Sequence, residues 1–89
     1  MKSFSVEYDD KAKKILAKMD PPVRNRIRAW IDKNLVGCEN PRWRGKPLEG
    51  RLSTYWRYRV GDYRIIVDIQ DDKIIILIVN VDKRNDIYK

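Results

Sequence analysis

Three arginines lie close together in the sequence, on either side of the dipeptide Gly61-Asp62. They are Arg57, Arg59 and Arg64. An arginine side chain binds a phosphate through two parallel hydrogen bonds, and a cluster can stabilise negative charge that develops on a reacting phosphate. The alternative is that the three arginines lie on a solvated face, each extended into water. The fold of the surrounding segment distinguishes these two interpretations.

That segment has the pattern of a β-hairpin. Val, Ile and Tyr dominate residues 54–79, and glycine at the first turn position favours a two-residue type II′ turn. This turn pairs Val60 with Tyr63 and Arg59 with Arg64, and it places the three arginines on one face. The other face is the predicted core: Trp56, Tyr58, Val60, Tyr63, Ile65, Val67 and Ile69. Like charges directly opposite each other destabilise a sheet unless an anion neutralises them, so the pairing favours a binding site.

A strand and two helices are predicted before the hairpin. Residues 2–8 alternate between apolar and polar side chains, as in a strand, and Asp9 or Asp10 can cap the helix that follows. The dipeptide Pro21-Pro22 ends this helix and begins a second one, which runs from about Pro22 to Val36 with Gly37 as C-cap. Both helices carry an apolar stripe, so the pair can pack on a sheet.

A further turn at Asp71-Asp72 leads into the last strand. A two-residue turn here pairs Ile69 with Ile74 and Arg64 with Val79. This strand is apolar on both faces, which places it at the centre of the sheet and covered on both sides. We therefore predict a single α+β domain over residues 1–89, with a helical hairpin packed on a twisted antiparallel sheet in the order β-α-α-β-β-β.

Composition restricts the chemistry. The 89 residues carry 20 Lys and Arg against 13 Asp and Glu, a net charge of +7 that favours an anionic partner. There is no histidine and one cysteine, Cys38, which excludes a Cys–His nucleophile and the usual His/Cys metal sites, and we predict no cofactor. The longest apolar run is too short to span a bilayer, and the N-terminus does not resemble a signal peptide. We expect a cytoplasmic protein with no membrane partner.

The loop over residues 39–50 carries further basic residues around an aromatic one. Arg42, Trp43, Arg44 and Lys46 alternate in the way that suits stacking on bases and neutralising phosphates. The other interpretation is a loop folded over the core with Trp43 buried beneath it. We expect the second arrangement for Trp43.

Cleavage of RNA by its own 2′-hydroxyl, which attacks the adjacent phosphate, requires a base, stabilisation of charge and an acid at the leaving oxygen. Arginine does not give up its proton, so Lys46, Lys83 and Tyr88 are the titratable candidates near the cluster. Glu49 and Asp68 are weaker candidates. We expect Asp68, on the arginine face, to pair with an arginine instead.

The run WRYRVGDYRIIVDI, the apolar strand after it and the closing DKRNDIY resemble the RelE/ParE superfamily of toxins from bacterial and archaeal toxin–antitoxin pairs. The resemblance covers essentially the whole chain. It implies a toxin held inactive by a cognate antitoxin in a heterodimer or heterotetramer, with any DNA binding made through the antitoxin. In the RelE branch it further implies entry into the ribosomal A site and metal-independent cleavage of mRNA.

The resemblance also assigns roles to residues. Arg57 and Arg59 match a basic pair, Arg64 would stabilise the phosphorane, Arg84 would act at the leaving oxygen, and Tyr88 would orient or stack the substrate. The remaining RNA-binding residues are expected to be Arg42, Arg44, Lys46 and Lys83. Ribonuclease members carry lysines where Arg57 and Arg59 stand, which leaves the base open. A ParE-like poison of DNA gyrase and an inactive basic binding domain remain as alternatives.

Overall fold

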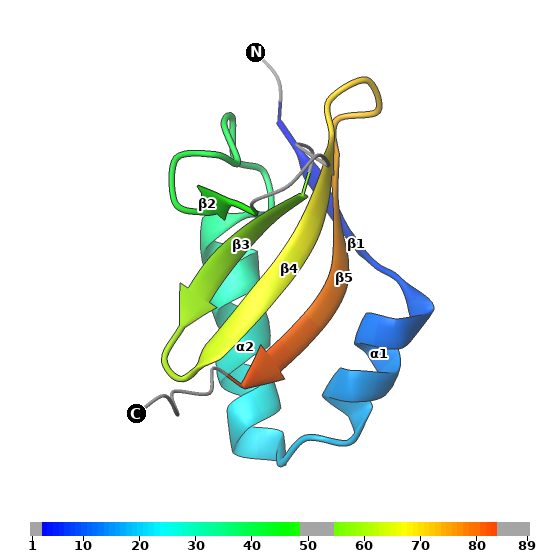
Figure 1. The fold of residues 1–89 in the computed structure, drawn as a ribbon, viewed down its shortest axis with the longest axis vertical. Helices are drawn as coiled ribbons and strands as arrows, with labels where there is room; N and C mark the ends of the chain where they lie inside the picture. The colour runs from blue at the N-terminus through cyan, green and yellow to red at the C-terminus, as the bar shows by residue number, and fades with distance from the viewer. Residues whose placement is uncertain (1–2, 49–54, 84–89) are drawn as a thin grey trace.

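The computed structural model describes residues 3–48 and 55–83 (Figure 1). The chain forms two helices and five strands; four of the strands follow the predicted order and one, Lys46–Pro47, is an additional short strand. The elements are β1 (Ser5–Tyr8), α1 (Asp10–Ala17), α2 (Pro21–Asn34), β2 (Lys46–Pro47), β3 (Tyr55–Val60), β4 (Tyr63–Gln70) and β5 (Ile75–Lys83). The α+β architecture with a helix pair against a sheet is therefore confirmed.

All five strands belong to one sheet in the order β1-β5-β4-β3-β2. β5 lies inside the sheet, as predicted. The sheet is mixed rather than wholly antiparallel, because β1 runs parallel to β5 while the other neighbours are antiparallel. Parallel neighbours need a long crossover connection, and the helix pair begins that connection after β1.

The helices begin where the sequence predicts. The Asp9 side chain accepts a hydrogen bond of 2.9 Å from the Ala12 backbone N–H and caps α1. α2 begins at Pro21, and the chain leaves it through Gly37, whose φ of +79° suits glycine. α2 lies behind the sheet in Figure 1, so the helices cover one of its faces. Neither helix in the described residues is long and apolar enough to cross a membrane.

The core lies between this sheet face and the helices. Tyr58, Val60, Ile65, Val67 and Ile69 are buried as predicted, whereas Trp56 and Tyr63 are half-buried at the margin. The remaining core residues come from the helices, from β5, and from Phe4 and the α2 C-cap Leu35: Phe4, Ala12, Leu16, Ile27, Ile31, Leu35, Ile76, Ile78 and Val81. Each large aliphatic side chain that becomes fully buried contributes about 1.5–3 kcal/mol.

The β3–β4 hairpin has the predicted register. Arg59 lies opposite Arg64, and Val60 lies opposite Tyr63. Gly61 has a φ of +60° and Asp62 has no positive φ, which agrees with a type II′ turn. The arginines therefore lie on the sheet face that α2 does not cover.

The predicted β4–β5 register is wrong. Ile69 lies opposite Ile76 rather than Ile74, and Arg64 lies opposite Asp82 rather than Val79. The turn occupies residues 71–74, with Ile74 at a φ of +56°, and a bulge opposite Ile66 and Val67 shifts the register again. The consequence is that a carboxylate lies beside Arg64.

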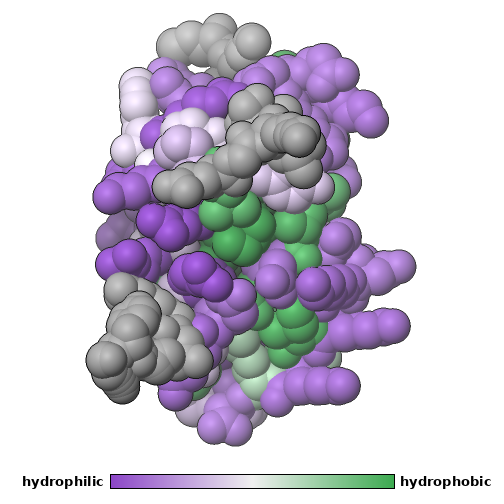
Figure 2. All heavy atoms as spheres, in the orientation of Figure 1, coloured by the Kyte–Doolittle hydropathy of each residue, from purple (hydrophilic) through white to green (hydrophobic). Residues whose placement is uncertain are grey.

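β5 is not covered on both sides within the described residues. On the face away from the helices, Ile75, Leu77 and Val79 are half-buried. Figure 2 views the molecule from this side and shows hydrophobic groups in the middle, with hydrophilic groups on both flanks.

Candidate functional site

A cavity of about 240 Å³ is formed by β2, β3, β4 and the residues just before β2. Its lining is Arg44, Gly45, Lys46, Arg57, Arg59 and Arg64. Every side chain in this set is positively charged, apart from the glycine. No carboxylate of the described residues lines the cavity. The five cations repel one another, and an anion bound among them lowers that repulsion.

β2 provides one wall of the cavity because Gly45 allows a very close approach to β3. A Cβ atom at Gly45 would lie 2.6 Å from the Arg57 carbonyl oxygen and 2.8 Å from the Tyr58 ring. Lys46 then pairs with Arg57 across the two strands. The glycine therefore brings Arg44 and Lys46 against the arginines of the hairpin.

Asp82 orients Arg64 within the cavity wall. The Arg64 Nε donates to one Asp82 carboxylate oxygen and a terminal nitrogen donates to the other, both at 3.1 Å. Each side chain is 37% exposed, so solvent weakens the attraction, but the two parallel bonds still fix the plane of the guanidinium. Arg57 and Arg59 form no ion pair with any described residue.

The expectation that Asp68 pairs with an arginine is wrong. Its carboxylate accepts a hydrogen bond of 3.2 Å from the Gln70 side-chain amide. Asp82 takes the role that was expected of Asp68, because the bulge brings Asp82 opposite Arg64. Sequence reasoning missed Asp82 for that reason, since nothing local to β5 signals the bulge.

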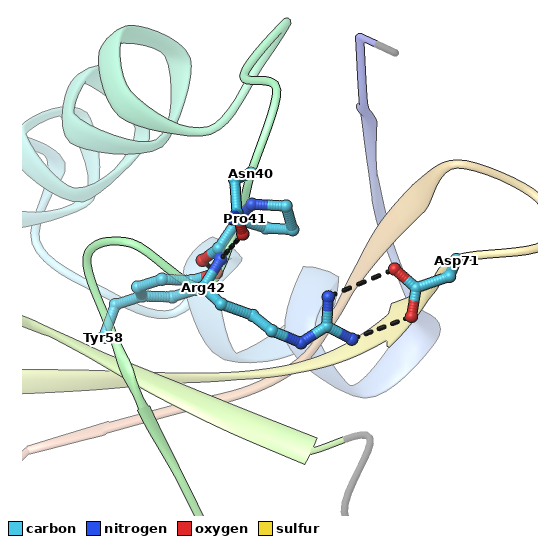
Figure 3. A network of polar contacts seen from close by, with 5 residues as sticks. All are labelled: Asn40, Pro41, Arg42, Tyr58 and Asp71. Carbon is cyan, nitrogen blue, oxygen red and sulfur yellow. Dashed lines mark hydrogen bonds and ion pairs between the residues drawn. The ribbon is translucent and has the colours of Figure 1, made fainter.

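Arg42 does not line the cavity, and this weakens the expectation that it binds RNA. Its two terminal nitrogens donate to the Asp71 carboxylate at 3.1 and 2.8 Å (Figure 3). The guanidinium carbon also lies 5.8 Å from the centre of the Trp56 ring. Arg42 thereby ties the loop after α2 to the β4–β5 turn.

A buried hydrogen bond holds the same loop on its other side. The Tyr58 hydroxyl donates to the Pro41 carbonyl oxygen at 2.5 Å, and the Arg42 backbone N–H donates to the Asn40 side chain at 3.0 Å (Figure 3). Burial raises the pKa of Tyr58, so the hydroxyl stays protonated and able to donate. These contacts position the chain that leads into Arg44.

The expectation that Trp43 fills the core is wrong, because its side chain is 74% exposed. The space beneath the loop is occupied by Pro41 and by Tyr58, whose ring centre lies 5.6 Å from that of Trp30. Trp43 instead presents an aromatic surface immediately before Arg44.

The other predicted site residues lie elsewhere. Lys83 is exposed and lines a different hollow, beside Asp62 and Tyr63. Arg84 and Tyr88 lie outside the described residues, as does Glu49. Cys38 is a free, half-buried cysteine.

A larger hollow of about 750 Å³ lies between α1 and α2, beside Tyr8. Its lining mixes charges of both signs, including Lys13, Arg28 and Asp32. This mixture does not select for anions, so the smaller cavity remains the candidate site.

The cationic cavity thus lies on the face of an α+β sheet that α2 leaves uncovered. The family model for the ParE toxin of the type II toxin–antitoxin system parDE matches residues 6–88, and the chain belongs to this family within the RelE/ParE superfamily. It is 32% identical to toxin RelG of Mycobacterium tuberculosis over 88 residues, which is 97% of each chain. It is 27% identical to the mRNA interferase toxin RelE of Escherichia coli over 84 residues, covering 92% of this chain and 84% of that protein.

Solved structures show the same fold. The toxin–antitoxin complex RelBE2 of Mycobacterium tuberculosis matches with a TM-score of 0.83 at 28% identity, covering 97% of both chains. The isolated RelE toxin of Escherichia coli matches with a TM-score of 0.76 at 22% identity, covering 97% of this chain and 92% of that one, and this second likeness concerns the fold alone. The protein is thus a toxin of a type II toxin–antitoxin system.

Proposed function

We propose that this toxin cleaves mRNA on the ribosome, without a metal ion, and so inhibits translation in the cytoplasm. The observation that carries the proposal is the cavity lined by Arg44, Lys46, Arg57, Arg59 and Arg64. Such a cluster attracts a phosphate and repels a metal cation, so guanidinium groups would supply the charge stabilisation that a metal supplies elsewhere. Two curated relatives at 27–32% identity, toxin RelG and mRNA interferase toxin RelE, support the proposal.

The geometry suggests a division of labour within the cavity. Arg64, held in one orientation by Asp82, would stabilise the charge on the phosphorane. Arg57 and Arg59, which have no carboxylate partner among the described residues, would bind the phosphates on either side. Arg84 and Tyr88, outside the described residues, keep the roles that the family resemblance implies, at the leaving oxygen and against the substrate.

Lys46 is our candidate for the general base. Arginine remains protonated, so Lys46 is the one side chain among the described cavity residues that can accept and release a proton. It lies opposite Arg57 across the β2–β3 pair, within the cationic set. Lys83, the other lysine considered, lines a different hollow and is not part of this arrangement.

A cognate antitoxin would hold the toxin inactive. Several structures that share this fold are toxin–antitoxin complexes, including RelBE of Escherichia coli and RelB–RelE of Methanococcus jannaschii. We propose that the partner of this chain covers the cationic cavity or alters its geometry, and that any DNA binding occurs through the antitoxin.

The test is a brief expression of the toxin in growing cells, followed by mapping of mRNA ends and an assay of DNA supercoiling. New cuts within translated messages support the nuclease. Loss of supercoiling with intact mRNA supports the second candidate, a ParE-like gyrase poison, which the family match keeps open.

Arg64→Ala and Arg84→Ala should each relieve growth arrest while antitoxin binding persists, whereas the exposed control Lys11→Ala should remain toxic. Full toxicity of both arginine variants would refute the site.

A further inference from the structure

Arg59 lines two adjoining hollows. On one side it belongs to the cationic cavity, and on the other it borders a hollow of about 480 Å³ on the flank of α2. The α2 residues of this second hollow include Arg26, Trp30, Lys33 and Asn34. The two hollows therefore form one continuous surface with Arg59 at the junction.

The surface is continuous because the sheet edge is open at this point. β2 is only two residues long and pairs with β3 at Trp56 and Arg57. Beyond this pair, among the described residues, β3 itself is the edge of the sheet. An extended chain can therefore pass from the cavity over Arg59 to α2 without crossing another strand.

The exposed Arg26 side chain extends toward this edge, beside the β3–β4 turn. A Cβ atom at Gly61 would lie 2.8 Å from a terminal nitrogen of Arg26, so the guanidinium lies close to the glycine. By contrast, Arg28 on the same helix lies over the Tyr8 ring at 5.5 Å, on the side of the larger hollow. The basic residues of α2 are thus divided between two surfaces, and Arg26 belongs to the one that meets Arg59.

The positive charges of the second hollow are not balanced by carboxylates among the described residues. Arg26, Lys33 and Arg59 form no ion pair with any described residue, and no carboxylate lines the hollow within that part of the chain. A solvated helix face requires no such arrangement, because its cations can extend away from one another. Here Arg26 and Arg59 border the same hollow from a helix and a strand.

We infer that the flank of α2 binds an RNA phosphate backbone, with Arg26 and Lys33 contacting phosphates beyond those held in the cavity and Arg59 bridging the two segments. This inference rests on the proposed function in one respect, that the ligand of the cavity is RNA. The phosphates belong either to the strand in the cavity or to ribosomal RNA beside it. The chemistry of recognition is the same in both cases.

The experiment measures binding rather than cleavage, so its outcome is separate from that of the nuclease test. Purified toxin is titrated with a 2′-O-methyl trinucleotide, with a 2′-O-methyl dodecanucleotide and with ribosomes, each over a series of salt concentrations. The double variant Arg26→Ala/Lys33→Ala is compared with Lys11→Ala/Lys14→Ala, which removes the same charge from exposed positions on α1. Arg26→Lys keeps the positive charge but changes the group beside Gly61, so it shows whether a change at the β3–β4 turn alone alters binding.

We expect the double variant to reduce the slope of log affinity against log salt by about 1.4, since each phosphate contact on a single strand contributes about 0.7. The control and Arg26→Lys should change it little, and the trinucleotide should not distinguish the variants. A reduced slope with the dodecanucleotide assigns the contact to the strand in the cavity, and a reduced slope with ribosomes alone assigns it to ribosomal RNA. Two outcomes would overturn the inference: slopes equal to those of the control with both the dodecanucleotide and ribosomes, or no binding of either ligand by the unmodified toxin.

Discussion

Arg59 and Arg64 lie directly opposite each other in the β3–β4 ladder, and Arg64 is also opposite Asp82 on its other side. Asp82 therefore offsets part of the repulsion between the two guanidinium groups without entering the cavity lining. Arg59 has no such partner among the described residues and borders both cationic hollows. The two arginines thus differ: Asp82 fixes the orientation of Arg64, whereas Arg59 is available to bind a ligand.

Asp82→Asn should separate folding from catalysis. The ion pair is partly exposed, so its loss should reduce the free energy of unfolding by only about 0.2–1 kcal/mol. RNA affinity should hold or rise, because a negative charge near the cavity is removed, but cleavage should fall because Arg64 loses its orientation. Denaturant unfolding, RNA titration and a cleavage assay measure the three effects. Asp68→Asn, which alters only a contact with Gln70, is the matched control. Full cleavage activity in Asp82→Asn would contradict the role of Asp82 in orienting Arg64.

Lys46→Arg should abolish proton transfer while it preserves charge. If Lys46 is the general base, this variant should cleave about 100-fold more slowly or worse, because arginine does not release its proton. Its RNA affinity should remain near that of the unmodified toxin, whereas Lys46→Ala should lose both properties. Single-turnover cleavage and anisotropy titrations separate the two. Lys83→Arg serves as the control, and a Lys46→Arg protein with full activity would remove Lys46 from the mechanism.

Gly45→Ala should displace β2 from β3. The added Cβ would meet the Arg57 carbonyl oxygen at 2.6 Å, and a backbone group cannot move aside as a flexible side chain can. We expect a loss of about 1–3 kcal/mol in the free energy of unfolding, together with weaker RNA binding as the cavity wall shifts. Arg44→Ala is the contrasting variant, because it should weaken RNA binding with little change in stability. An unaltered Gly45→Ala protein would show that the close approach is not needed.

Tyr58→Phe should lower the free energy of unfolding at neutral pH. It should also make that free energy depend less on pH in the alkaline range. The Pro41 carbonyl would lose its buried donor, which costs about 1–3 kcal/mol. Burial raises the pKa of Tyr58 above the value of 10.0 for a free tyrosine, so the stabilisation is fully present below that pH and is lost as the pH rises further. Urea unfolding at pH 8 and at more alkaline pH should therefore show a smaller decline for Tyr58→Phe than for the unmodified protein. Equal declines would contradict this account.

Trp43→Ala should leave stability almost unchanged. An exposed side chain makes few contacts that folding can use, so the change should stay within about 0.5 kcal/mol. Trp30→Ala, which removes the ring packed on Tyr58, should cost about 3 kcal/mol by comparison. Thermal or urea unfolding of the two variants provides the measurement, and a large loss for Trp43→Ala would restore the expectation of a buried ring.

The features that followed from sequence are those set by short-range geometry. The two-residue turn at Gly61-Asp62 fixed the hairpin register, and that register put Arg59 opposite Arg64. Period-two alternation then identified the buried side chains in the middle of the hairpin, Tyr58, Val60, Ile65, Val67 and Ile69. Both inferences need only neighbouring residues, which explains why they are confirmed.

The features that did not follow depend on distant parts of the chain. The β4–β5 turn uses Ile74 at a positive φ, a conformation that a β-branched residue rarely adopts, so no sequence signal marks it. The bulge and the partner of Arg64 were missed with it. Gly45 went unnoticed as well, because its close approach to β3 is a tertiary contact, and the exposure of Trp43 depends on how Pro41 and Tyr58 fill the space below.

The cavity residues between Arg44 and Arg64 all come from one antiparallel meander, whereas Asp82 arrives with the last strand. Local pairings of this kind close short loops and form readily, while the parallel contact of β1 with β5 closes a long one. The cationic surface therefore depends on pairings between neighbouring strands, whereas the carboxylate that orients Arg64 takes its place only when β5 joins the sheet.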